Sequence, residues 1–98
     1  MMEMNSGDLL PDLVADLAGQ DGPVNLTSAT KIEVVGYRDG VEVLRRVVTG
    51  DAQGKVVMPW QTGDTGVGTL GVRWEVTWPG EKVQTFPPAG LEWVRFAP

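Results

Sequence analysis

Four aspartates, Asp8, Asp12, Asp16 and Asp21, are the residues of this chain whose chemistry could hold a divalent cation. Carboxylate oxygens are the ligands that Ca²⁺ prefers in proteins. A calcium loop, however, brings its ligands together at alternate positions, and these aspartates are spaced more widely. We therefore predict that they are solvated or cap turns, and that the chain binds no metal ion.

Catalytic chemistry has few other candidates. The chain contains no histidine and no cysteine, which removes the usual general base, the commonest metal ligand, thiolate metal sites and disulfides. Acidic side chains without a cleft to desolvate them do not point to acid–base catalysis. We predict a protein that is not an enzyme and that uses no cofactor.

A glycine-rich segment, GDTGVG at residues 63–68, superficially resembles a phosphate-binding loop. A P-loop also needs a lysine at its end and a helix after it, and this segment has neither in the sequence pattern. We predict that it forms a turn.

The four tryptophans, Trp60, Trp74, Trp78 and Trp93, raise a binding hypothesis of another class. Exposed aromatic rings can stack on a sugar, so a carbohydrate-binding module for host-surface glycans is one alternative. The other interpretation buries the rings, because large aromatic side chains dominate small cores. Apolar residues fill every second position of one segment, and we predict that this set forms a core face: Leu70, Val72, Trp74, Val76 and Trp78.

Basic residues are few and are expected to be paired. Arg45 and Arg46, with Arg38 across the predicted hairpin, could form a basic patch, but we predict a solvated face paired with Glu33 and Glu42. The formal charge of −5 argues against nucleic acid and against anionic membrane surfaces. We find no signal-peptide pattern and no apolar run long enough for a membrane span.

The elements that position these side chains are predicted to be strands. Strict alternation from residue 70 to 78 is the period of a half-buried strand. Asp39-Gly40 predicts a tight hairpin turn of the primed type. Turn signals about every ten residues predict a small all-β, antiparallel sandwich of six to seven strands. The predicted strands are residues 31–38, 41–49, 55–60 and 70–78, a short strand after residue 80, and residues 91–96.

The N-terminal part contains a short first segment and a second segment that fits two patterns. We expect residues 1–7 to form a flexible tail and residues 8–98 a single domain. Within residues 8–18, Leu10, Leu13, Val14 and Leu17 would share one face of a helix, and this period is favoured. A strand is the alternative, with Pro11 at an edge or a bulge.

Four segments carry a resemblance to a known family. They are DGPVNLTSAT (residues 21–30), GKV followed by WQTGDT (54–56 and 60–65), WEVTW (74–78) and QTFP (84–87). In this order they resemble the small immunoglobulin-like domains of tailed-phage virions, with their DGxPVDLTGAT, GxV…WQxGDT, FEVTW and QTFP motifs. The similarity covers about residues 8–96 and is to the N-terminal domain of phage baseplate upper proteins and related short tail or head proteins.

The chain also departs from that family. Asn25 stands where aspartate is usual, Ser28 stands where glycine is usual, and residues 35–48 match poorly. The resemblance implies an immunoglobulin-like sandwich with a strand, not a helix, within residues 8–18. It implies a structural protein of a phage-like virion, assembled in the host cytoplasm: a minor tail, baseplate or adaptor component or, alternatively, a head decoration protein. Its partners would be other virion proteins, in multiple symmetric copies.

Such a protein would act through its surface and its sheet edges, because an edge strand can pair with another chain. The last predicted strand offers apolar groups on both faces. We therefore expect it, with residues 1–7, to contact neighbouring proteins, and residues 35–48 are the second choice. The predicted contact residues are Leu91, Trp93, Val94 and Phe96.

Overall fold

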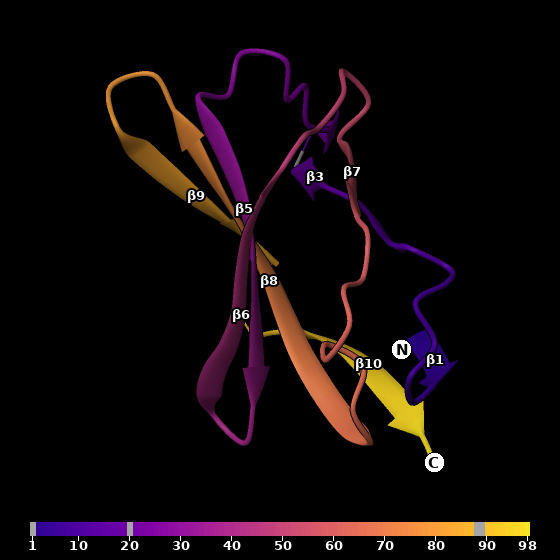
Figure 1. Cartoon of the computed structure of the whole chain (residues 1–98). Helices are drawn as coiled ribbons and strands as arrows, with labels where there is room; N and C mark the ends of the chain where they lie inside the picture. The colour runs from indigo at the N-terminus through magenta and orange to yellow at the C-terminus, as the bar shows by residue number, and fades with distance from the viewer. Residues whose placement is uncertain (1, 20, 88–89) are drawn as a thin grey trace.

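The structure, a computed structural model, describes residues 2–19, 21–87 and 90–98. These residues form ten strands and no helix, in a two-layered, sandwich-like arrangement that confirms the predicted all-β class (Figure 1). The larger number of strands comes from short strands near the N-terminus. The strands are β1 (Met2–Asn5), β2 (Leu13–Asp16), β3 (Ala18–Gly19), β4 (Gly22–Pro23), β5 (Lys31–Arg38), β6 (Val41–Val48), β7 (Lys55–Met58), β8 (Gly68–Trp78), β9 (Lys82–Phe86) and β10 (Glu92–Ala97).

One sheet of six strands makes up the first layer, in the order β1-β10-β8-β5-β6, with β9 also beside β8. Because β8 is eleven residues long, its first half pairs with β10 and its second half with β9. The second layer is a smaller sheet in which β2 pairs with β7. A two-residue ribbon, β3 with β4, extends it.

The alternation that predicts β8 is visible in its burial. Leu70, Val72, Trp74 and Val76 are each at most 1 % exposed, and they face the second layer as part of one apolar core. Trp78 is the exception, because it is only half-buried at the end of the strand. Its Nε1–H donates to Oε1 of Gln84 on β9 at 3.0 Å.

The hairpin between β5 and β6 turns as predicted. Asp39 and Gly40 both have positive φ, 51° and 78°, which is the conformation that a type I′ turn requires. The register of the two strands shifts between Gly36 and Tyr37. A Cβ at Gly36 would meet Leu44 at 3.1 Å and Leu70 at 3.2 Å, so these leucines would have to shift by a few tenths of an ångström to admit a larger residue.

The expectation of a flexible N-terminal tail is wrong. Strand β1 pairs with β10 in parallel, so the sheet is also not purely antiparallel. Met4 is buried in the core and Met2 packs against it, while Glu3 between them faces solvent. This short alternation, together with an available edge on β10, explains why the first residues form a strand.

The helix favoured for residues 8–18 is also wrong, and the strand implied by the resemblance is present as β2. Pairing with β7 buries Leu13, with Leu17 just beyond the strand, and leaves Val14 exposed. Leu10, which the helix would have placed on the buried face, is 75 % exposed. Strand pairing and core contact therefore override the helical period.

Candidate functional site

The predicted contact strand, β10, is not an edge of the sheet. It lies between β1 and β8, and Val94 and Phe96 on its inner face are almost fully buried. These two residues are therefore core residues, and assigning them to an interface was wrong. Leu91 is half-buried, and Trp93 on the outer face is 46 % exposed. Of the four predicted contact residues, Trp93 is the most accessible.

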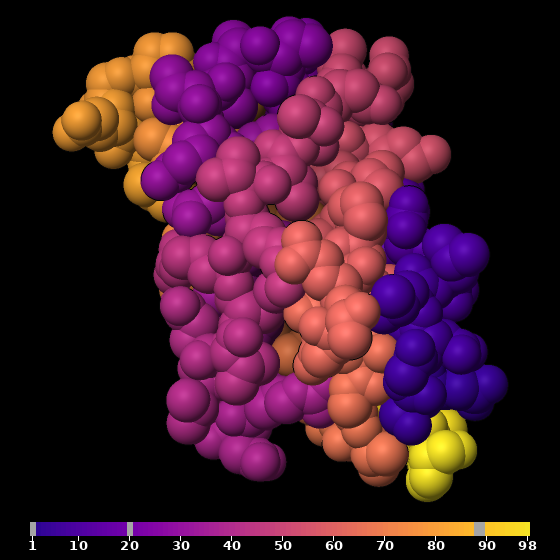
Figure 2. Space-filling view, in the orientation of Figure 1, coloured from indigo at the N-terminus to yellow at the C-terminus, as the bar shows by residue number. Residues whose placement is uncertain are grey.

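Three strands of the main sheet pair with one neighbour only among the described residues: β1 with β10, β9 with β8, and β6 with β5. Of these, β6 is the longest, with eight residues. Val41, Val43 and Val47 on this strand are exposed by 54 to 67 %. Figure 2 shows β6, in magenta, running along an outer border of the molecule. The longest open edge of this sheet, and the one with three exposed valines, is thus within residues 35–48, the second choice of the sequence analysis.

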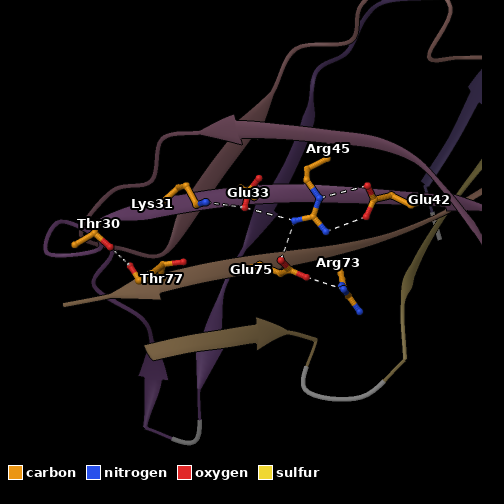
Figure 3. Close-up of polar contacts among 8 residues, drawn as sticks. All are labelled: Thr30, Lys31, Glu33, Glu42, Arg45, Arg73, Glu75 and Thr77. Atoms are coloured by element: carbon orange, nitrogen blue, oxygen red, sulfur yellow. Dashed lines mark hydrogen bonds and ion pairs between the residues drawn. The ribbon is translucent and has the colours of Figure 1, made fainter. Parts of the chain in front are cut away.

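Polar side chains cover the outer face of the main sheet beside this edge (Figure 3). The Arg45 guanidinium donates to Glu42 at 2.9 Å, to Glu75 at 3.1 Å and to Glu33 at 3.4 Å. Hydrogen bonding to Arg45 lowers the pKa of Glu42, and its bonds with Glu42 and Glu75 raise the pKa of Arg45. The predicted pairing with Glu33 and Glu42 is confirmed for Arg45. It is wrong for Arg46, which pairs with Asp64.

Charged side chains also bury an apolar residue on this face. Val35 is fully buried although it points away from the core, and its direct neighbours across the two adjacent strands are Arg45 and Arg73. Long arginine stems can cover apolar surface while their charged ends stay in water. The Arg73 guanidinium also lies over the Tyr37 ring, 5.2 Å from its centre. We conclude that this face is a solvated cover and not an anion-binding patch.

Arg46 points to the opposite side and pairs with Asp64, a residue that the sequence analysis placed only in a turn. Asp64 Oδ2 also accepts from the backbone N–H of Gln61 at 2.7 Å. Burial by itself raises the pKa of Asp64, but the bonds from Arg46 and Gln61 and the charge of nearby Arg38 outweigh it, so the pKa is lowered. The Arg38 guanidinium donates to the backbone oxygen of Asp64 at 2.9 Å.

The WQTGDT motif therefore has a structural explanation. Trp60 packs edge-on against Phe96, and its Nε1–H donates to the Pro11 carbonyl at 3.0 Å. The buried Thr65 accepts the N–H of Gly7 through its carbonyl and its hydroxyl. This segment joins the N-terminal residues to the core. The chain turns at its start, where the N–H of Asp64 donates to the Gln61 carbonyl at 3.0 Å, and Gly68 begins β8.

Metal and sugar chemistry find little support in the geometry. Among the described residues, no three acidic, histidine or cysteine side chains come together as a metal site. Of the four tryptophans, only Trp93 is exposed, whereas Trp60 and Trp74 are buried. A platform of two coplanar exposed rings is therefore not formed. The part of the chain that the structure describes also holds no helix suited to crossing a bilayer.

A groove lies between the two layers on the side away from β6. Its volume is about 430 Å³, and it separates β2 from the inner face of β8 and β10. Leu13, Val14, Trp74 and Val94 are among its lining residues. The Nε1–H of Trp74 is buried and has no hydrogen-bond acceptor in the described chain.

Comparisons with protein-family models, with curated proteins and with solved structures give no match to this chain.

Proposed function

We propose that this chain is a non-enzymatic structural protein of a phage-like virion, a tail, baseplate or adaptor component that acts through protein–protein contacts. The family resemblance of residues 8–96 suggests the particle. The observation that carries the mode of action is the open β6 edge with its three exposed valines. Backbone groups on such an edge can pair with another chain while the valines provide apolar contact area.

The polar surroundings of this edge suit a specific contact. Arg45 and Glu42 lie on β6 among the valines and already pair with one another. Charged residues on an edge strand discourage indiscriminate pairing with other chains. A contact at β6 would therefore require a partner with matching polar groups, which is the behaviour expected of a protein that assembles in one defined position.

Particle association tests this proposal. Particles are purified from the lysate by density gradient, and the chain is detected in each fraction with an antibody. We expect the chain to sediment with the particles and to remain with them after a wash that removes loosely adsorbed protein. Electron microscopy of the same particles would then distinguish a tail or baseplate position from decoration of the head.

A matched pair of variants tests the contact surface. Val47→Glu places a charge on the β6 edge, and we expect it to reduce incorporation into particles. Val83→Glu makes the same change at an equally exposed valine on β9, and we expect normal incorporation. Recovery of the wild-type chain only in the particle-free fractions would contradict the proposed function.

A further inference from the structure

We infer that β2 and the groove beside it form a strand-accepting site, which takes up an extended segment of a neighbouring protein as an additional strand. This inference deepens the proposed function and rests on it only for the source of that segment. It concerns the side of the sandwich opposite to β6, so the chain would have two separate contact surfaces.

The backbone of β2 is the first argument. In the described chain β2 pairs with β7 alone. The N–H of Leu17 donates to Gly54 at the end of this pair, at 2.7 Å, and N–H and C=O groups alternate in direction along a strand. The groups of Leu13 and Ala15 therefore point to β7, and those of Val14 and Asp16 point to the open edge, where another strand could bond to them.

The unequal size of the two layers is the second argument. The first layer has six strands, whereas the sheet that faces it has two. A strand added to β2 would lie about 4.8 Å from it, on the side of the groove. Met2, Trp74 and Val94 line this region, and they would pack against every second side chain of the added strand.

The buried indole of Trp74 is the third argument. This residue is 1 % exposed and lines the groove, and its Nε1–H has no acceptor in the described part of the chain. A buried donor without a partner costs free energy, so such groups are rare in folded proteins. A carbonyl or hydroxyl oxygen of the added strand would supply the missing acceptor.

The charges around the groove indicate what kind of segment would bind there as the added strand. Glu92 lines the groove, and Asp12 and Asp16 stand at the two ends of β2. None of these three carboxylates takes part in an ion pair among the described residues. A matching segment therefore has alternating apolar and polar residues, with lysine or arginine at its ends.

A synthetic peptide tests the inference directly. Nitrogen-15-labelled chain is titrated with acetyl-KTVTVTVTK-amide up to about 1 mM, where weak binding still has measurable occupancy, and two-dimensional NMR spectra are recorded. We expect a saturable shift of the Trp74 indole N–H and slower hydrogen exchange of the Val14 and Asp16 amides. The peptide with glutamate at both ends should bind about tenfold more weakly, because like charges then face the rim.

Two variants locate the site. Val14→Glu places a charge at the groove, and we expect it to weaken binding about tenfold or more. Val57→Glu makes the same change at the residue directly opposite Val14 on β7, one strand further from the groove, and should bind the peptide as the wild type does. Both residues are exposed, so both variants are expected to fold.

Several outcomes would overturn the inference: no saturable shift, an unchanged Trp74 indole signal, shifts confined to β6, or equal binding by both variants. The particle experiment fails or succeeds separately. A chain that joins particles but does not bind the peptide would leave the proposed function standing and remove the strand-accepting site. A chain that binds the peptide but never joins particles would leave the strand-accepting site standing and contradict the proposed function.

Discussion

The two long sides of the sandwich differ in how the layers meet. Near β6 the layers are joined, because Gly50 forms a bridge to Val56 of β7 and Arg46 of β6 pairs with Asp64 in the loop after β7. Between β2 and β10 the layers are separated by a groove that Trp74 lines, and the buried Nε1–H of this residue has no acceptor among the described residues. One side is fixed by polar contacts within the chain, whereas the proposed strand-accepting site lies on the other.

This difference shows how a chain of 98 residues can hold its two layers together on one side while apolar surface stays accessible elsewhere. A domain of this size buries only part of its surface, so its core is thin. Ion pairs and turn contacts at residues 60–65 strengthen one side. In the proposed role, the apolar surface that remains on the other side and on β6 would be buried against neighbouring proteins.

The largest expected effect is the loss of the residue beneath the groove. Trp74→Ala should reduce the free energy of unfolding by about 3–5 kcal/mol, because it leaves a cavity between the layers. Trp93→Ala removes the same side chain from the outer face and should cost much less. Chemical denaturation of both variants checks this, and equal midpoints would show that the two rings are equally buried in solution.

Asp64→Asn should open the joined side. The substitution removes a charged acceptor that bonds to Arg46 and to the Gln61 N–H, and we expect a loss of about 2 kcal/mol. Glu42→Gln also removes a charge that faces an arginine, but on the exposed outer face. It should leave the denaturation midpoint almost unchanged. A larger loss of stability in Glu42→Gln than in Asp64→Asn would contradict the distinction between the two ion pairs.

A smaller effect is expected at the turn that leads into β6. Gly40→Val should destabilise the chain by about 1–2 kcal/mol, because a β-branched residue resists the positive φ of 78°. Gly40→Asn tolerates that conformation better and serves as the control. Thermal unfolding compares the two, and a Gly40→Val chain as stable as the wild type would exclude the tight turn.

Acid should weaken the joined side of the sandwich. The pKa of Asp64 in the folded chain is lowered from its ordinary value of 3.8, so its contribution to stability is present above that value and is lost as the pH falls further, through the lowered pKa. The wild type should lose more stability than Asp64→Asn between pH 5 and the acid limit of folding. Parallel acid titrations of the two chains would reject this role if their losses were equal.

The smallest effects are expected on the open side. Val14→Glu and Val57→Glu should each change the free energy of unfolding by less than about 0.5 kcal/mol, because both side chains are exposed. The two variants should nevertheless differ in peptide binding. A large loss of stability in Val14→Glu alone would mean that the groove is closed in solution.

Local pattern was sufficient to predict most of the fold. Alternation from residue 70 to 78 and the Asp39-Gly40 turn appear in the structure as predicted, because both depend on neighbours along the chain. The N-terminal residues could not be assigned in this way. Met2–Asn5 form a strand only because β10 offers them an edge, and Leu13–Asp16 only because β7 pairs with them.

The open edges of the sheet were harder to predict than its strands. Apolar residues on both faces of residues 91–96 suggested an exposed edge, yet β1 covers that edge and places Val94 and Phe96 in the core. The order of strands in a sheet depends on contacts between distant segments. The sequence pattern alone could therefore not identify β6 as an edge strand of the main sheet. The ion pair of Asp64 could not be predicted either, because its partner Arg46 lies eighteen residues away in the sequence.

The most direct test of the proposed role is the density of this chain in an intact particle at a resolution that separates strands. The account predicts that the chain is present with neighbouring protein against β6, and with an extended segment paired to β2 over Trp74. A particle that lacks the chain, or one in which both edges face solvent, would contradict it.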